Sequence, residues 1–168
     1  MDQEPFLASS ICICCGRAES RASQIRHCYR SIIETQMTIH YNCDNLIEAL
    51  RNELQEYGEL LNLFNEQESA VIEHKPNLFL AAREAIVLQF DAINKCKTRR
   101  EKNIKNFAKA VGQVPDSPLR GLIDSCADAA RPLLHALMDE VSRLILRTKR
   151  RAQQNQMLLA RFPEVSAN

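Results

Sequence analysis

Residues 44–73 read DNLIEALRNELQEYGELLNLFNEQESAVIE, the segment with the clearest helical period in the chain. Its apolar side chains recur mostly at steps of three and four residues, a spacing that places them on one face of an α-helix. The repeated positions are Leu46, Leu50, Leu54, Tyr57, Leu61, Phe64 and Val71. Asp44 can accept hydrogen bonds from the unpaired amides of the first turn. The pattern therefore predicts a helix over residues 44–73.

A second helix is predicted over residues 77–111, where the same spacing continues. Its apolar positions are Phe79, Ala82, Ile86, Phe90 and Ile93, followed by Ile104, Phe107 and Val111. Between the two groups the matching positions are Lys97 and Arg100, so this section either leaves the core or keeps its aliphatic stems buried and its charges in water. Pro76 either kinks one long helix or begins this second one, and Gly112 favours its end.

A third helix is predicted over residues 118–162. Ser117 is suited to cap it, Pro118 to occupy its first position, and Pro132 to kink it near Asp128. Apolar residues recur as far as Ile145, and residues 149–156 are then polar. Together the patterns predict an all-α fold, an elongated antiparallel bundle of three long helices, some of them kinked at proline.

The composition supports this fold and excludes several classes of protein. The chain has 168 residues, only 4 glycines and 6 prolines, and a net charge of +1 from 22 basic and 21 acidic groups. Residues 44–73 carry eight acidic groups and one basic group, whereas residues 95–109 carry seven basic groups and one acidic group. Such helices are expected to pair through opposite charge. No apolar run reaches the roughly 18 residues of a membrane span, so we expect no membrane insertion.

Residues 1–36 differ from the rest of the chain. They hold four of the seven cysteines and show no sustained helical period, so we expect a poorly patterned leader, disordered or not native, before a helical domain over residues 37–168. Met37 is a candidate natural start. The acidic N-terminus and the odd cysteine count favour a reducing cytoplasm with free thiols. Alternatively Cys12 and Cys15, with Cys28, His40 or Cys43, could complete a zinc site.

Residues typical of catalysis are missing from the sequence. There is no glycine-rich phosphate loop, no Glu-x-x-His pair for a di-iron site and no G-x-S-x-G turn. We therefore predict that the protein is not an enzyme and has no catalytic, cofactor-binding or metal-ligating residues. The basic stretches lack interleaved aromatic residues, and the acidic first helix would oppose phosphate, which disfavours nucleic-acid binding.

The helical part resembles the FlgN-type flagellar export chaperones. The resemblance rests on LIEALRNELQEYGELL at residues 46–61, on Glu66 and Glu68, on the second helix centred on Arg83, and on NQMLL at residues 155–159. It covers about residues 37–162.

The resemblance implies a cytoplasmic chaperone without cofactors. Such a protein binds the disordered C-terminal segments of hook–filament junction (hook-associated) proteins and delivers them to the type III export gate or its ATPase components. The C-terminal helix is the usual client-binding part in this family, which implies that the following residues contact the client: Leu144, Arg147, Arg151, Asn155, Met157, Leu158 and Leu159.

Three alternatives remain open from the sequence. Leu144 and Leu158 could equally belong to the bundle core. The protein could be a structural, self-associating bundle that assembles through its second helix. It could also be a basic-helix nucleic-acid binder.

Overall fold

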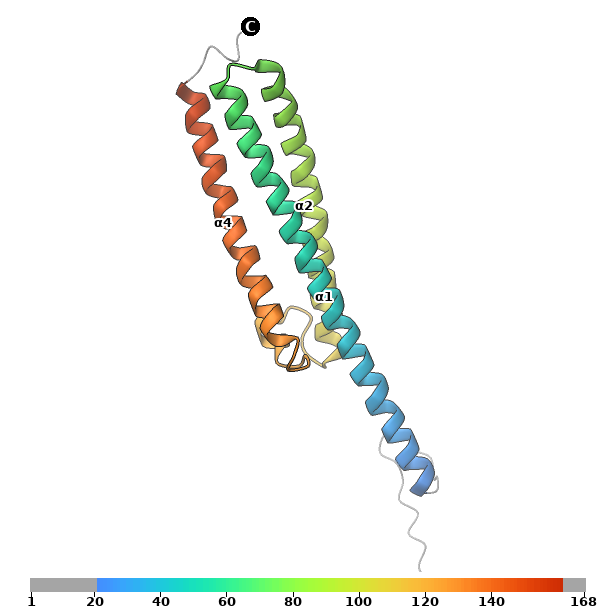
Figure 1. Cartoon of the computed structure of the whole chain (residues 1–168). Helices are drawn as coiled ribbons and strands as arrows, with labels where there is room; N and C mark the ends of the chain where they lie inside the picture. Colours follow the sequence, from blue (N-terminus) through green and yellow to red (C-terminus); the bar gives the residue numbers. More distant parts are fainter. Residues whose placement is uncertain (1–20, 162–168) are drawn as a thin grey trace, which may run out of the picture. The chain divides into compact units, whose positions relative to one another are not determined.

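A computed structural model describes residues 21–161, and all the regular structure within this range is helical (Figure 1). The helices are α1 (Arg21–Ile72), α2 (Pro76–Ala110), the short α3 (Leu119–Ile123) and α4 (Arg131–Arg161). The all-α prediction is therefore confirmed. The chain divides into two compact units, Met1–Thr38 and Ile39–Asn168, and α1 contributes residues to both.

The first helix starts earlier than the sequence pattern predicts. α1 begins at Arg21, so Asp44 lies within a continuous helix and does not cap one, and that prediction is wrong. Ile25, Tyr29 and Ile32 follow helical steps of four and three, a pattern too short and too isolated to be recognised in the sequence alone. In the unit that ends at Thr38, these three side chains are more than half exposed.

Within the unit that begins at Ile39, α2 runs antiparallel to α1, and α4 runs parallel to α1. Gln89 bonds to Glu56, whereas the later Asn103 bonds to the earlier Asn45, which fixes the antiparallel direction. Buried α1 positions recur at alternating steps of three and four, and α2, α3 and α4 pack against them. These α1 positions are Cys43, Leu46, Leu50, Glu53, Tyr57, Leu60, Phe64, Gln67 and Val71.

Local chemistry ends α1 and begins α2. The amide of Lys75 donates to the carbonyl of Ala70 and the amide of His74 donates to that of Val71, which is the Schellman pattern with His74 at a positive φ of 55°. Pro76 then occupies the start of α2. Pro76 therefore begins a new helix and does not kink a longer one. This position suits proline, because the amide hydrogen that it lacks would have no partner in the first turn of a helix.

The end of α2 follows the prediction closely. Gly112 has a positive φ of 70°, and the amides of Gly112 and Gln113 donate to the carbonyls of Lys109 and Ala108. This is a second Schellman motif, with glycine in the position that favours it.

The predicted third helix is two helices. Residues 124–130 separate α3 from α4, so the single kinked helix is corrected to a break, and Pro132 lies in the first turn of α4. A proline cannot donate to the preceding turn and excludes helix just before it, which explains why the chain breaks here. Ser117 does not cap α3 either: Pro118 is its N-cap residue and makes no side-chain hydrogen bond there.

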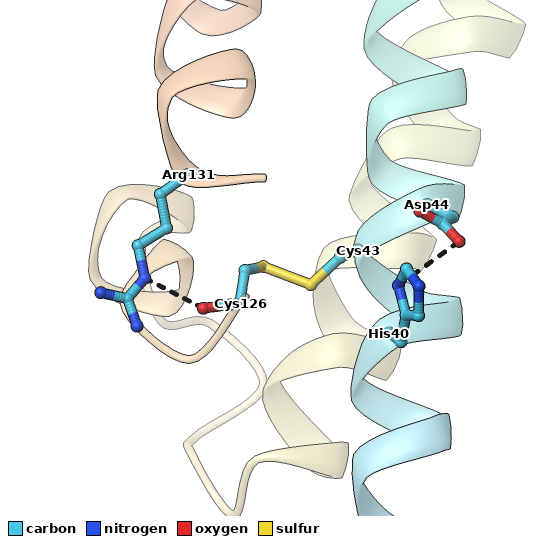
Figure 2. Close-up of a disulfide and its surroundings, with 5 residues drawn as sticks. All are labelled: His40, Cys43, Asp44, Cys126 and Arg131. Carbon is cyan, nitrogen blue, oxygen red and sulfur yellow. Dashed lines mark hydrogen bonds and ion pairs between the residues drawn. A yellow bond between two sulfur atoms is a disulfide. The ribbon is translucent and has the colours of Figure 1, made fainter. Parts of the chain in front are cut away.

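Two cysteines are not free thiols. Cys43 of α1 and Cys126 of the α3–α4 connection form a disulfide, with their Cα atoms 6.3 Å apart (Figure 2). The expectation of free thiols throughout is therefore wrong for this pair, since sequence spacing carries no information on two residues 83 positions apart. Cys28 and Cys96 are free, and the Cys12 and Cys15 of the zinc alternative lie outside the described residues. Between residues 21 and 161 there is no cluster of metal ligands.

Candidate functional site

The seven residues expected to bind a client all lie on α4, and the structure divides them into two groups. Arg147 and Met157 are exposed to solvent, with 58% of Met157 accessible. The other five are buried or half-buried and face the bundle: Leu144, Arg151, Asn155, Leu158 and Leu159.

The buried face of α4 changes character at Thr148. Before this position the side chains packed on the core are apolar and include Leu134 and Val141. From Thr148 to Asn155 the corresponding positions are Thr148, Ala152 and Asn155, which are small or polar, and apolar residues return only at Leu158 and Leu159. Burial of such residues removes less apolar surface from water than burial of leucine or valine. The C-terminal half of α4 is therefore held to the bundle less strongly by the hydrophobic effect than its N-terminal half.

Polar contacts join this C-terminal half to α1. The side-chain amide of Asn155 donates to the carbonyl oxygen of Phe64 at 2.8 Å and to Oε1 of Gln67 at 3.0 Å. Arg151 forms an ion pair with Glu68 at 2.9 Å, in which both side chains are roughly one-third exposed. The hydroxyl of Thr148 and Oδ1 of Asn155 are buried and have no hydrogen-bond partner among the described residues. This polar seam is thus incompletely satisfied.

Leu158 and Leu159 complete the seam at its end. With Asn155 they line a narrow crevice against Gln67, Glu68 and Val71 of α1, too small to hold a water molecule. The two leucines therefore contact α1 while α4 is docked, but Leu158 lies outside the core cluster, whereas Leu144 packs against it.

The outer face of α4 combines apolar and basic side chains. Leu146 and Met157 lie three helical turns apart on this face and are 54% and 58% exposed. Arg147, Lys149 and Arg150 are exposed beside them. Residues 141–161 contain no acidic residue at all. The sequence patterns did not single out Leu146 as a site residue, because it lies outside both the core stripe and the NQMLL motif. Only its exposure in the structure identifies it as part of this surface.

The basic stretch of α2 is partly neutralised by α1. Arg99 lies 3.5 Å from Glu48 at the surface, and Arg100 lies 3.3 Å from Glu53, whose side chain is fully buried. Burial raises the pKa of Glu53, while the charges of Arg100 and Lys97 act in the opposite direction. Arg100 thus keeps its aliphatic stem in the bundle and serves as the partner of a buried carboxylate. Because Arg99 and Arg100 are both paired with α1, neither is free to bind phosphate.

One further finding concerns membranes. No helix within the described part of the chain combines the length and the apolarity of a membrane span.

Comparison with known proteins identifies a family. The model of the FlgN protein family matches residues 37–166. No curated protein and no solved structure matched the chain. The matched segment includes the bundle part of α1, all of α2 and α3, and the whole of the mixed polar and apolar surface of α4. The chain therefore belongs to the FlgN family of flagellar export chaperones.

Proposed function

We propose that this chaperone binds the disordered C-terminal segments of hook–filament junction proteins through the C-terminal half of α4, in the cytoplasm, and passes them to the export gate or its ATPase components. The observation that carries the proposal is the change of the α1–α4 seam at Thr148 from apolar to small and polar. A helix end held by a few polar contacts and two half-buried leucines can separate from its bundle at lower cost than one packed into an apolar core.

Separation of this end would uncover apolar side chains that α1 covers while α4 is docked. Leu158 and Leu159 contact α1 while α4 is docked, whereas Met157 already faces solvent. Once α1 no longer covers the leucines, an amphipathic client helix can pack on them together with Met157. In helix-in-groove recognition, the apolar face of such a client helix is buried against apolar side chains of the partner.

The charges of α4 suggest the chemistry of the client. Arg147, Lys149 and Arg150 are exposed, and no acidic residue lies in the same stretch. A client segment with acidic side chains flanking its apolar positions would be attracted to this surface, and one with basic flanks would be repelled. Arg147 and Arg151 would then contact the rim of the client.

The test is calorimetric titration of the full chain with a synthetic peptide covering the C-terminal segment of a hook–filament junction protein. We expect a Kd on the order of 10 μM, a moderate affinity that permits release, and a gain in helicity by circular dichroism. Absence of both signals would overturn the proposal.

A matched pair of substitutions locates the site. Met157→Asp places a charge on the proposed surface, and Val87→Asp does the same on α2, where the exposed fraction is 59% against 58% for Met157. We expect Met157→Asp to weaken binding at least about tenfold and Val87→Asp to leave it unchanged. Equal effects of the two changes would place the client elsewhere.

Self-association is the second candidate function, and one observation favours it. Leu80, Val87 and Leu88 of α2 are each more than half exposed and lie close together along the helix. Sedimentation of the free protein that depends on concentration and is abolished by Val87→Asp would support assembly through this face. The same variant therefore separates the two functions.

A further inference from the structure

The Cys43–Cys126 disulfide joins two parts of the bundle that are distant in sequence. Cys43 lies in α1, and Cys126 lies in the connection of residues 124–130 between α3 and α4 (Figure 2). The Cα separation of 6.3 Å falls within the range that a disulfide can span. The two side chains are 1% and 2% exposed, so the pair lies inside the core.

We propose that Cys43 and Cys126 are a reversible oxidation site, at which a low-molecular-weight disulfide such as oxidised glutathione fastens α1 to the α3–α4 connection. The inference rests on the proposed function only for the compartment: the structure shows the oxidised pair, and in a reducing cytoplasm the same pair is reduced to a dithiol. Its geometry and its chemistry are independent of any client.

The oxidation proceeds by two exchange steps. The thiolate of one cysteine attacks a sulfur of oxidised glutathione, which forms a mixed disulfide and releases one glutathione thiolate. The thiolate of the second cysteine then attacks the protein sulfur of the mixed disulfide and releases the second glutathione. In total the two protein thiols lose two protons and two electrons, and one glutathione disulfide is reduced to two thiols.

Access to the pair depends on the α3–α4 connection. Neither an oxidant nor a reductant reaches sulfur atoms that are almost fully buried, so exchange requires this connection to open. Arg131 braces this connection: its Nε donates to the carbonyl oxygen of Cys126 at 2.9 Å (Figure 2). Its guanidinium also pairs with Asp128 at 3.0 Å. The strength of the Arg131 contact therefore sets the rate of exchange.

Oxidation affects the two ends of α4 differently. The disulfide fixes the chain just before α4 to α1, whereas the far end of α4 is held by the polar contacts of Asn155 and Arg151. An oxidised molecule can still release the C-terminal half of α4, but its N-terminal half stays beside α1.

The experiment uses the full chain equilibrated in buffers of increasing ratio of oxidised to reduced glutathione. Remaining thiols are alkylated, and the digest is analysed by mass spectrometry without reduction. We expect a linked peptide pair containing Cys43 and Cys126 that appears with oxidation and disappears with dithiothreitol. Alkylation of both residues at every ratio, or pairing of either with another cysteine, would overturn the proposal.

Two variants sharpen the test. A chain with serine at the five other cysteines leaves only this pair to react, and it should give the same midpoint as the natural chain. Arg131→Ala should accelerate reduction by dithiothreitol about tenfold, because one charge-assisted hydrogen bond no longer closes the connection. Arg143→Ala, which removes a surface pair with Glu140, is the control and should leave the rate unchanged. Equal rates in all three proteins, each checked for helicity, would refute the role of Arg131. Since no client is present, failure here is separate from failure of client binding.

Discussion

Arg100→Ala removes the positive charge that faces the buried carboxylate of Glu53. The Glu53 side chain is fully buried and that of Arg100 is 23% exposed, with Nε and Oε2 3.3 Å apart. Neither carboxylate oxygen accepts a hydrogen bond from any described residue. Loss of one partner of a fully buried pair costs about 3–5 kcal/mol, because the other charge is left uncompensated. Since Arg100 reaches solvent and Lys97 remains nearby, we expect a loss of about 2–3 kcal/mol at neutral pH.

The loss should depend on pH in a defined direction. Burial already raises the pKa of Glu53 above its ordinary 4.5, and removal of Arg100 raises it further. The folded state then binds the proton more tightly than the unfolded state, so the free energy of unfolding decreases as the pH rises from the unfolded pKa through the folded pKa. The deficit of Arg100→Ala is therefore largest at neutral pH and shrinks on acidification toward 4.5.

Urea denaturation followed by circular dichroism at about pH 7 and about pH 5 measures both effects. Arg99→Ala is the matched control: it breaks a pair with Glu48 in which both side chains are about 60% exposed, so it should cost less than about 1 kcal/mol. Adding Glu53→Gln to Arg100→Ala should recover most of the loss. Equal costs for Arg99→Ala and Arg100→Ala, or a larger Arg100→Ala deficit at the lower pH, would refute this reasoning.

Three further changes test the packing of the bundle. Gly58→Ala should raise the free energy of unfolding by up to about 1 kcal/mol, since a Cβ there meets nothing within 4 Å; a decrease in urea denaturation would show a hidden clash. Asn155→Ala should cost about 1–3 kcal/mol in the same assay, because it removes two buried hydrogen bonds to α1 and leaves Oε1 of Gln67 without this donor, and no cost would mean that α4 is already detached there. Reduction of the disulfide should lower the free energy of unfolding of the oxidised chain by about 2–4 kcal/mol and leave that of the Cys43→Ser/Cys126→Ser chain unchanged. Equal responses of the two chains would show that the disulfide does not stabilise the fold.

Features of the fold that depend on neighbouring residues were predictable from the sequence. The repeat on α1, the start of α2 at Pro76 and its end before Gly112 all arise within a few residues of chain. The break before α4 was underestimated as a kink, because the pattern continued through Cys126 and Ala130. The long N-terminal extension of α1 was missed because its apolar positions are few.

The sequence predicts the helix that carries the candidate site, but it does not predict which of its side chains are exposed. A helical period shows that Leu144, Asn155 and Leu158 share a face, and it does not show whether that face points inward. The partners that bury Asn155 lie 88 and 91 residues away in α1, so only the tertiary structure reveals them. The buried pair of Glu53 and Arg100 was hidden for the same reason, although the gap in the α2 stripe marked the position of Arg100.

Site-specific photo-crosslinking determines directly whether the end of α4 holds the client. A benzoylphenylalanine is placed at Met157 or, as the control of equal exposure, at Val87 on α2. The chaperone is then irradiated with the C-terminal peptide of a hook–filament junction protein, and the products are mapped by mass spectrometry. We predict a crosslink from position 157 and none from position 87. A crosslink from position 87 alone, or from neither position while calorimetry shows binding, would contradict the account.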